Sequence, residues 1–195
     1  MSDATINRKT KETEVSVELT LDGRGERDIN SSIPFLDHML NQLAQHGYFD
    51  ITLAAAGDTE VDYHHTVEDC GISLGKAFAE ATGERKGIVR FGHAAVPLNE
   101  ALSTVTVDFS GRPFFVFSGG LPKGKIGEFD VELIEEFLSA FANNAGITLH
   151  VKIEYGNNLH HIAETIFKAL ARALDAAARP EPRSTDVPST KGTLQ

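Results

Sequence analysis

The feature that most constrains the fold of this chain is an internal duplication. The stretches "DYHHTVEDCG" and "NLHHIAETIF" each contain two adjacent histidines, followed three positions later by a glutamate. When His64 is aligned with His160, an offset of 96 residues, Glu68 falls on Glu164 and the apolar positions that follow also correspond. Such a repeat predicts two similar structural units that bury their apolar faces together.

The segments around the two motifs predict the same order of elements. In each half, an alternating strand region ("ETEVSVELTLDG" or "VTVDFSGRPFFVFSG") precedes an amphipathic helix that ends at a glycine, Gly47 or Gly146. A second alternating strand ("YFDITLAAAG" or "GITLHVKIEYG") leads into the helix that carries the histidine pair. We therefore predict an α+β fold of two tandem half-domains, packed sheet edge to edge or helix layer to helix layer into one pseudo-symmetric domain.

The halves and the tail are expected to form a single domain over residues 1–195. Half one is predicted to cover residues 1–86, with "TGERKG" as the linker, and half two residues 87–178. The remaining tail, residues 179–195, reads "RPEPRSTDVPSTKGTLQ". Its content of Pro, Ser and Thr by itself predicts disorder.

Composition excludes several classes of protein. The net charge of −10 argues against a nucleic-acid surface, although a few local arginines and lysines can still hold one small anion. No apolar leader opens the chain and no apolar run approaches the roughly 20 residues of a membrane span, so neither export nor a membrane is expected. The single cysteine, Cys70, leaves no internal disulfide and favours a reducing, cytoplasmic location.

Helix geometry indicates what the repeated HHxxE pattern can do. Side chains at i and i+4, such as His64 and Glu68, share one face of a helix, whereas the adjacent His65 points about 100° away. The two imidazoles of a pair therefore fan out. This arrangement suits two metal ions better than one.

Ligands for two ions are available from both halves. His38, 26 residues before His64, aligns with Glu136 in the second half, and both side chains can bind a metal. The eight candidate ligands are His38, His64, His65, Glu68, Glu136, His160, His161 and Glu164. Four ligands for each of two ions leave positions open on an octahedral Mn or Fe ion, whereas a closed four-ligand zinc site leaves no position for chemistry.

Several long motifs resemble those of the imidazoleglycerol-phosphate dehydratase family of histidine biosynthesis, and together they cover nearly the whole chain. They are "FLDHMLNQLAQHG" (35–47), "DYHHTVEDCGISLG" (62–75), "RFGHAAVPLNEAL" (90–102), "DFSGRP" (108–113), "NAGITLHV" (144–151), "GNNLHHIAETIFKALARAL" (156–174) and "PSTKG" (188–192). The resemblance implies that each half is a four-stranded sheet with helices on one face, as in domain 2 of ribosomal protein S5. It also implies an octahedral homo-oligomer with two Mn(II) ions per active site, bound between subunits.

The resemblance further implies a reaction and the residues that perform it. Family members dehydrate D-erythro-imidazole glycerol phosphate to imidazole acetol phosphate, through a metal-bound imidazolate and a diazafulvene-like intermediate. The implied catalytic carboxylates are Glu12, Glu68 and Glu164, with Glu12 in the acid/base role. The implied substrate-binding residues are Glu12, His38, His46, His64, His65, Glu68, Arg90, Arg112, His160, His161, Lys168, Thr190, Lys191 and Gly192.

The phosphate would be held by the basic residues of this set together with the tail, which would then order over the substrate. A metal-dependent hydrolase using the same ligands would need no such pocket. A metal-linked structural or storage cage would bind metal without turnover. An RNA-binding module of related fold is disfavoured because the chain is acidic. The set Arg90, Arg112, Lys168 and Lys191 favours the dehydratase, since a phosphorylated substrate explains it.

One position departs from the family pattern. Many members carry histidine where this chain has Glu136, so its role as a metal ligand stays open. His93 and His150 also lie within the matching motifs, but neither falls on a repeated ligand position. Both are assigned structural roles.

Overall fold

The structure is a computed structural model that describes residues 3–194, and its two halves share one order of elements. The first half consists of β1 (Asp3–Lys9), β2 (Thr13–Thr20), β3 (Arg27–Asn30), α1 (Pro34–Gly47), β4 (Asp50–Gly57) and α2 (His64–Thr82). The second consists of β5 (Phe91–Leu98), β6 (Ala101–Asp108), β7 (Phe114–Ser118), β8 (Lys125–Ile126), β9 (Phe129–Asp130), α3 (Leu133–Ala145), β10 (Thr148–Tyr155) and α4 (Leu159–Ala178). The predicted order is confirmed, and the second half adds the short β8–β9 hairpin.

The two main sheets have equivalent strand orders, β1-β2-β4-β3 and β5-β6-β10-β7. In each sheet only the last pair, β3–β4 or β7–β10, is parallel. The first hairpins also share a register: Asp3 pairs with Thr20, and 88 residues further on Phe91 pairs with Asp108. The sequence duplication is therefore a structural duplication as well.

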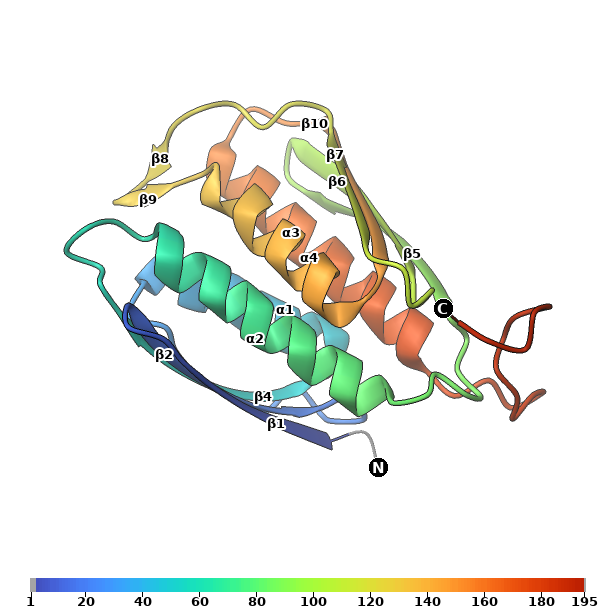
Figure 1. Cartoon of the computed structure of the whole chain (residues 1–195). Coiled ribbons are helices and arrows are strands. Elements are labelled where there is room, and N and C mark those ends of the chain that lie inside the picture. The colour runs from blue at the N-terminus through green and yellow to red at the C-terminus, as the bar shows by residue number, and fades with distance from the viewer. Residues whose placement is uncertain (1–2, 195) are drawn as a thin grey trace.

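The long helices lie between the two sheets, so that the halves meet through their helices (Figure 1). Helix α2 packs against α3, and α1 packs against α4. Of the two arrangements predicted from the sequence, helix layer to helix layer is confirmed and sheet edge to edge is wrong. The reason is burial. Each sheet has one apolar face, formed in β2 by Val15, Val17 and Leu19, and helices that cover such a face must bury their other apolar side against the second half.

Aromatic rings fill the contact between the halves. Phe78 on α2 lies 5.2 Å from Phe141 on α3, with the rings edge to face. Within the second half, the ring of Phe137 on α3 lies 5.5 Å from that of Phe167 on α4 and continues the same cluster of rings. All four side chains are fully buried, so the two halves share one core.

Small residues let α2 and α3 approach closely. A Cβ placed on Gly71 would lie 2.7 Å from the carbonyl oxygen of Phe137, and one on Gly75 would lie 2.6 Å from that of Phe141. Glycine inside a helix costs about 1 kcal/mol relative to alanine. Here that cost is offset by the close contact between the two halves.

The helix ends agree with the sequence in one half and differ in the other. Helix α3 ends before Gly146, which adopts the left-handed conformation with φ +64°, as predicted. Helix α1 includes Gly47, and the left-handed residue is Tyr48, with φ +58°. Gly47 is needed for a different reason, because a Cβ there would lie 2.2 Å from the ring of Phe49.

The linker and the tail are both tied to the second half. Arg85 in the linker donates hydrogen bonds to the carbonyl oxygens of Ala145 and Gly146 at the end of α3. In the tail, the carbonyl oxygen of Pro188 accepts a 2.6 Å hydrogen bond from Arg90. The composition of the tail suggested disorder, but its described part packs against the domain because backbone and arginine groups bond to it. Within residues 3–194, no helix is long and apolar enough to cross a membrane.

Replacing Gly75 with valine should destabilise the domain. The added side chain would overlap the backbone of α3, at a cost of about 1–3 kcal/mol. Lys76→Val is the matched control, because it places the same β-branched residue on the exposed side of the same turn. Thermal unfolding should show a much lower midpoint for Gly75→Val than for the control. Equal midpoints would contradict the close approach of α2 and α3.

Candidate active site

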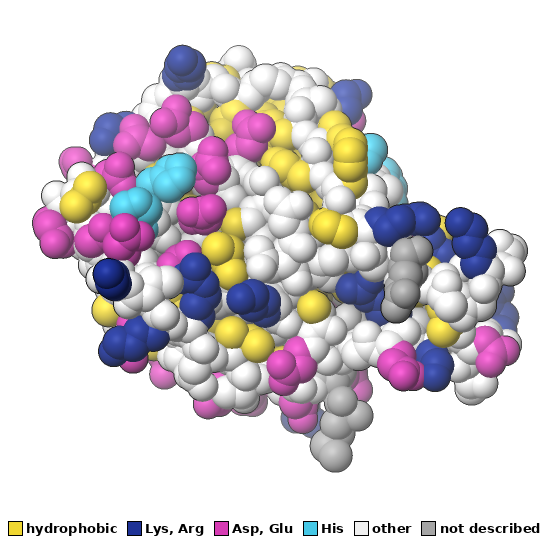
Figure 2. Space-filling view, viewed as in Figure 1, with side chains coloured by type: hydrophobic (Ala, Val, Ile, Leu, Met, Phe, Trp, Pro, Cys, Tyr) yellow, Lys and Arg dark blue, Asp and Glu magenta, His cyan; other side chains and the backbone are white. Residues whose placement is uncertain are grey.

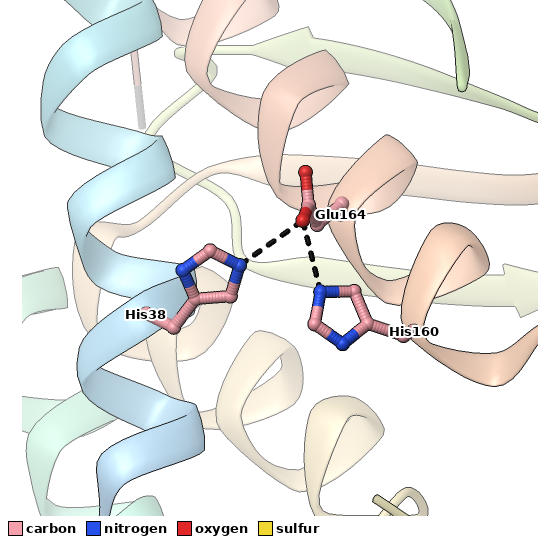
Figure 3. Close-up of side chains that lie close together, drawn as sticks. All are labelled: His38, His160 and Glu164. Atoms are coloured by element: carbon pink, nitrogen blue, oxygen red, sulfur yellow. Dashed lines mark hydrogen bonds and ion pairs between the residues drawn. The ribbon is translucent and has the colours of Figure 1, made fainter. Parts of the chain in front are cut away.

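The contact between α1 and α4 brings together three side chains that can bind a metal. The Nε2 atoms of His38 and His160 lie 3.0 Å and 2.9 Å from the same carboxylate oxygen of Glu164 (Figure 3). One ligand atom from each residue falls within 4.8 Å of the other two. Two imidazole nitrogens and a carboxylate oxygen suit Mn, Fe or Zn and leave coordination positions open. We call this group the α1–α4 cluster.

Glu164 is the electrostatic centre of the α1–α4 cluster. Burial alone would raise the pKa of its carboxyl group, but hydrogen bonds from Lys168, His38 and His160 outweigh it and lower the pKa to about 2. The Nζ of Lys168 lies 2.5 Å from Glu164 Oε2. His46 is half-buried on the last turn of α1, where burial and the nearby Lys168 lower its pKa. Because its pKa is about 2, the Glu164 carboxylate is ionised near neutral pH.

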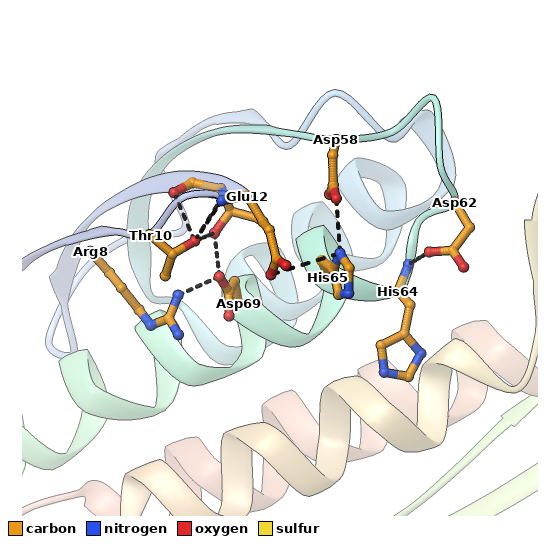
Figure 4. Close-up of polar contacts among 9 residues, drawn as sticks. Arg8, Thr10, Glu12, Asp58, Asp62, His64, His65 and Asp69 are labelled. Carbon is orange, nitrogen blue, oxygen red and sulfur yellow. Dashed lines mark hydrogen bonds and ion pairs between the residues drawn. The ribbon is translucent and has the colours of Figure 1, made fainter.

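The duplication predicts a second cluster from His64, Glu68 and Glu136, where α2 meets α3. These residues do not converge in the described chain, and Glu136 is exposed at the start of α3. The ring of His64 lies 6.2 Å from that of His65 at 89°, and the two rings point in different directions (Figure 4). The pair therefore fans out as helix geometry requires. The assignment of these three residues as ligands stays a prediction.

The outward-facing histidine of each pair is held by a carboxylate. His65 Nδ1 lies 2.9 Å from Asp58, which raises the pKa of the imidazole, and 3.9 Å from Glu12 (Figure 4). His161 Nδ1 lies 2.7 Å from Glu100. Glu100 has a pKa lowered to about 2, chiefly because it accepts a hydrogen bond from the backbone of Asn158 and also one from His161. Neither Asp58 nor Glu100 was among the residues predicted from the sequence.

Glu12 sits at the tip of the β1–β2 hairpin, and the base of that tip is firmly anchored. The buried carboxylate of Asp69 on α2 accepts hydrogen bonds from Arg8 and from the hydroxyl of Thr13 (Figure 4). Thr10 accepts hydrogen bonds from the backbone N–H groups of Glu12 and Thr13. The Glu12 carboxylate itself accepts no hydrogen bond from the described residues, and its side chain is 59% exposed. The hairpin tip is therefore held in place, while the Glu12 carboxylate keeps only its 3.9 Å ion pair with His65 among the described residues.

A pocket with basic walls lies at the opposite end of α4. Its volume is about 570 Å³. It is lined by Arg90, Ser110, Arg112, Pro188, Ser189, Thr190, Lys191, Thr193 and Leu194. Arg90 is partly neutralised by Asp108, at 2.7 Å, whereas Arg112 and Lys191 are exposed. In Figure 2, Lys and Arg side chains gather beside the C-terminal tail, and histidines ringed by acidic side chains lie at the other end of the same face. The pocket therefore suits a small anion such as a phosphate.

The structure brings some of the predicted phosphate ligands together and separates one. Arg90, Arg112, Thr190 and Lys191 line the pocket, and Gly192 lies directly beside it in the tail. Lys168 lies instead at the α1–α4 cluster, because its position one turn after Glu164 points it there. The sequence could have indicated Glu100, since it occupies the hairpin position equivalent to Glu12 when the halves are compared strand by strand.

The two remaining histidines lie away from both sites. His93 and His150 are exposed on the outer face of the second sheet, on either side of Thr106. His93 Nδ1 lies 3.0 Å from the Thr106 hydroxyl.

The fold and these two sites define a class of protein: an enzyme of two duplicated α+β halves, with an imidazole–carboxylate cluster and a separate pocket for an anionic group. The sequence profile of imidazoleglycerol-phosphate dehydratase matches residues 31–174. The chain therefore belongs to the imidazoleglycerol-phosphate dehydratase family, and it is accordingly a hydro-lyase.

Individual relatives agree with this assignment over nearly their full length. The imidazoleglycerol-phosphate dehydratase of Pelobacter propionicus is 56% identical over 98% of this chain and 98% of its own. That of Hydrogenovibrio crunogenus is 53% identical over 100% of both. Among solved structures, the enzyme of Staphylococcus aureus has a TM-score of 0.83 at 36% identity, covering 91% of this chain and 99% of its own. The Pyrococcus furiosus enzyme has a TM-score of 0.84 at 37% identity, covering 97% and 100%. The predicted family and fold class are confirmed.

From the lowered pKa of Glu164 we predict how the stability of the fold changes in acid. A carboxylate whose folded pKa is below its ordinary value of 4.5 stabilises the fold above that value, and this contribution is lost as pH falls towards about 2. The thermal midpoint of metal-free wild type should therefore exceed that of Glu164→Gln near pH 6, and the difference should shrink between about pH 4.5 and 2. Glu18→Gln, on an exposed strand position, is the control. A difference that does not change with pH would contradict the ion pairing of Glu164.

Proposed function

We propose that this enzyme converts imidazole glycerol phosphate to imidazole acetol phosphate in the cytoplasm, as a step of histidine biosynthesis. We further propose that it uses two Mn(II) ions per active site, bound between the subunits of an octahedral homo-oligomer. The observation that carries the proposal is the convergence of His38, His160 and Glu164 in a chain that also holds a basic pocket. The buried, unpaired thiol of Cys70 agrees with a reducing compartment.

The distance between the two sites supports an active site shared between subunits. His160 is near the start of α4, whereas the backbone N–H of Arg90 at the pocket donates to Ala177 near its end. Ala177 lies 17 positions after His160 on the same helix, which corresponds to about 25 Å. An imidazole ring joined to a phosphate by three carbons spans only about 10 Å. One substrate cannot reach both sites of one chain, so the cluster of one subunit would work with the pocket of a neighbour.

Lys168 fits this shared arrangement. Its ammonium group lies at the α1–α4 cluster, with a side chain only 17% exposed. When the pocket of a neighbouring subunit approaches, Lys168 would add a positive charge from the cluster side. The phosphate would then be held by Arg112 and Lys191 of one chain and by Lys168 of the other.

Loss of water requires two proton movements. The hydroxyl on the carbon attached to the imidazole must leave with a proton, and the next carbon must give up its hydrogen, so that an enol forms and becomes the ketone. Loss of the hydroxyl would give a diazafulvene-like intermediate. Bound Mn(II) would act as a Lewis acid that polarises the imidazole ring.

Glu12 is the residue best suited to proton transfer. Its hairpin is anchored by Asp69, and its carboxylate lies 3.9 Å from His65 without an accepted hydrogen bond among the described residues. The carboxylates of Glu164 and Glu68 lie on the same helices as the histidine pairs, where they would bind metal. Acid/base catalysis needs a carboxylate that can take up and release a proton. Glu12 would meet this need, whereas Glu68 and Glu164 would be bound to metal.

Metal removal should abolish turnover reversibly. Protein stripped with a chelator should not form imidazole acetol phosphate, and added Mn(II) should restore the rate, because the cluster leaves positions open for substrate. Steady-state kinetics measure this directly. Turnover that survives complete chelation would overturn metal dependence. Tight Mn(II) binding without turnover would favour a structural metal cage.

Mixed assemblies should reveal shared active sites. His160→Ala lacks a metal ligand, and Arg112→Ala/Lys191→Ala lacks phosphate ligands, so each alone should be nearly inactive. When the two variants are unfolded together and refolded with Mn(II), roughly a quarter of the sites would combine an intact cluster with an intact pocket. Activity should return towards that fraction. Two variants of the same cluster, His160→Ala and His38→Ala, serve as the control. No recovery would place both sites within one subunit.

A further inference from the structure

The tips of the two equivalent hairpins carry the same residue type in different surroundings. The pairing of β1 with β2 and of β5 with β6 is offset by 88 residues, which aligns Glu12 with Glu100. Glu100 Oε2 lies 2.7 Å from His161 Nδ1, and its Oε1 accepts backbone hydrogen bonds from Asn158 at 2.9 Å and Asn157 at 3.3 Å. Glu12 lies 3.9 Å from the equivalent His65 and accepts none from the described residues. The Glu100 carboxylate therefore has three hydrogen-bond partners, whereas the Glu12 carboxylate has only the long ion pair with His65 among the described residues.

Asp58 explains why Glu12 makes no short contact with His65. It lies 2.9 Å from His65 Nδ1 and so takes the place that Glu100 has in the other half. The pairing of β2 with β4 and of β6 with β10, with the register shift near the end of β10, aligns Gly57 with Gly156 and therefore Asp58 with Asn157. The two glycines also have equivalent neighbours, Thr13 and Thr66 for Gly57 and Ala101 and Ile162 for Gly156. Because Asn157 carries an uncharged amide where the first half has Asp58, the hairpin tip supplies the carboxylate in the second half.

We propose that Glu100 is a positioning residue that fixes the imidazole of His161 with Nδ1 as hydrogen-bond donor and Nε2 free for a metal ion. Asp58 does the same for His65. The two hairpin tips have therefore taken different roles: Glu100 orients a metal ligand, and Glu12 remains available for proton transfer. This inference rests on the proposed metal-dependent function.

The physical basis is the choice between two imidazole tautomers. A neutral imidazole carries its proton on one nitrogen only, and the nitrogen without a proton binds metal. An ionised carboxylate accepts hydrogen bonds but cannot donate them, so it keeps the proton of His161 on Nδ1. Removing such a partner of a metal-binding histidine lowers metal affinity by about 10- to 100-fold.

Glu100→Gln separates positioning from a merely structural role. The two backbone donors of Asn157 and Asn158 would hold the amide oxygen of the new side chain, so its NH₂ group would face His161 Nδ1. The loop before α4 would keep its hydrogen bonds, but His161 would be driven to the tautomer with its proton on Nε2. A structural role predicts wild-type behaviour for this variant, whereas positioning predicts weakened metal binding.

The experiment measures the dissociation constant of Mn(II) for the intact protein without substrate, together with the thermal midpoint. Glu100→Gln should raise the dissociation constant about 10-fold at an unchanged midpoint, and Glu100→Ala should raise it by up to about 100-fold. Glu154→Ala removes one negative charge from the same half, where its partner is Lys152, and should leave the constant unchanged. Glu12→Gln should also leave it unchanged while turnover falls.

The outcomes separate the two proposals. If wild type does not bind Mn(II), the proposed function fails. If wild type binds and Glu100→Gln binds equally well, the positioning role of Glu100 fails while the metal-dependent function stands. If Glu100→Ala does not fold, the Mn(II) dissociation constant of Glu100→Gln still tests the positioning role. Weaker Mn(II) binding by Glu12→Gln would overturn the division of roles between the two hairpin tips.

Discussion

The packing of helices across the two halves is the constraint on which the rest of the molecule depends. Each half buries the outer side of its helices against the other, with α1 against α4 and α2 against α3. This contact completes the core, and it also brings His38 of the first half to His160 and Glu164 of the second. The same burial therefore stabilises the fold and assembles the cluster. A loss of close packing at Gly71 or Gly75 would act on both.

Much of the fold could be predicted because the internal repeat is recognisable in the sequence. The order of elements, the two equivalent sheets and the diverging histidine rings all follow from the repeat and from strand and helix periodicity. The family could be recognised from long motifs. Periodicity could not decide how the halves meet, since both sheet edges and helix faces were available. Only the burial of a second apolar side on each helix makes that choice.

Details that depend on three-dimensional contacts were beyond the sequence. Gly47 resembles a helix cap, but it is required by the ring of Phe49, and Tyr48 takes the left-handed conformation instead. The family resemblance grouped Lys168 with the phosphate ligands. Its position one helical turn after Glu164 does place it at that carboxylate, but the distance of this group from the basic pocket could be known only from the fold. Asp58 and Glu100 do not belong to an HHxxE motif. The hairpin position of Glu100 could have drawn attention to it, but the partners of both carboxylates, His65 and His161, are known only from the distances.

The symmetry of the helix contacts has a consequence for how equivalent positions of the two halves can differ. Since α1 corresponds to α3 and α2 to α4, the contact of α1 with α4 and that of α3 with α2 are the same contact made twice. This is the isologous interface of a twofold dimer. Two separate, identical half-domains could form the same contact as a homodimer, and they would then have two identical sites. Because the halves are joined in one chain, equivalent positions are free to differ, as His38 and Glu136 do.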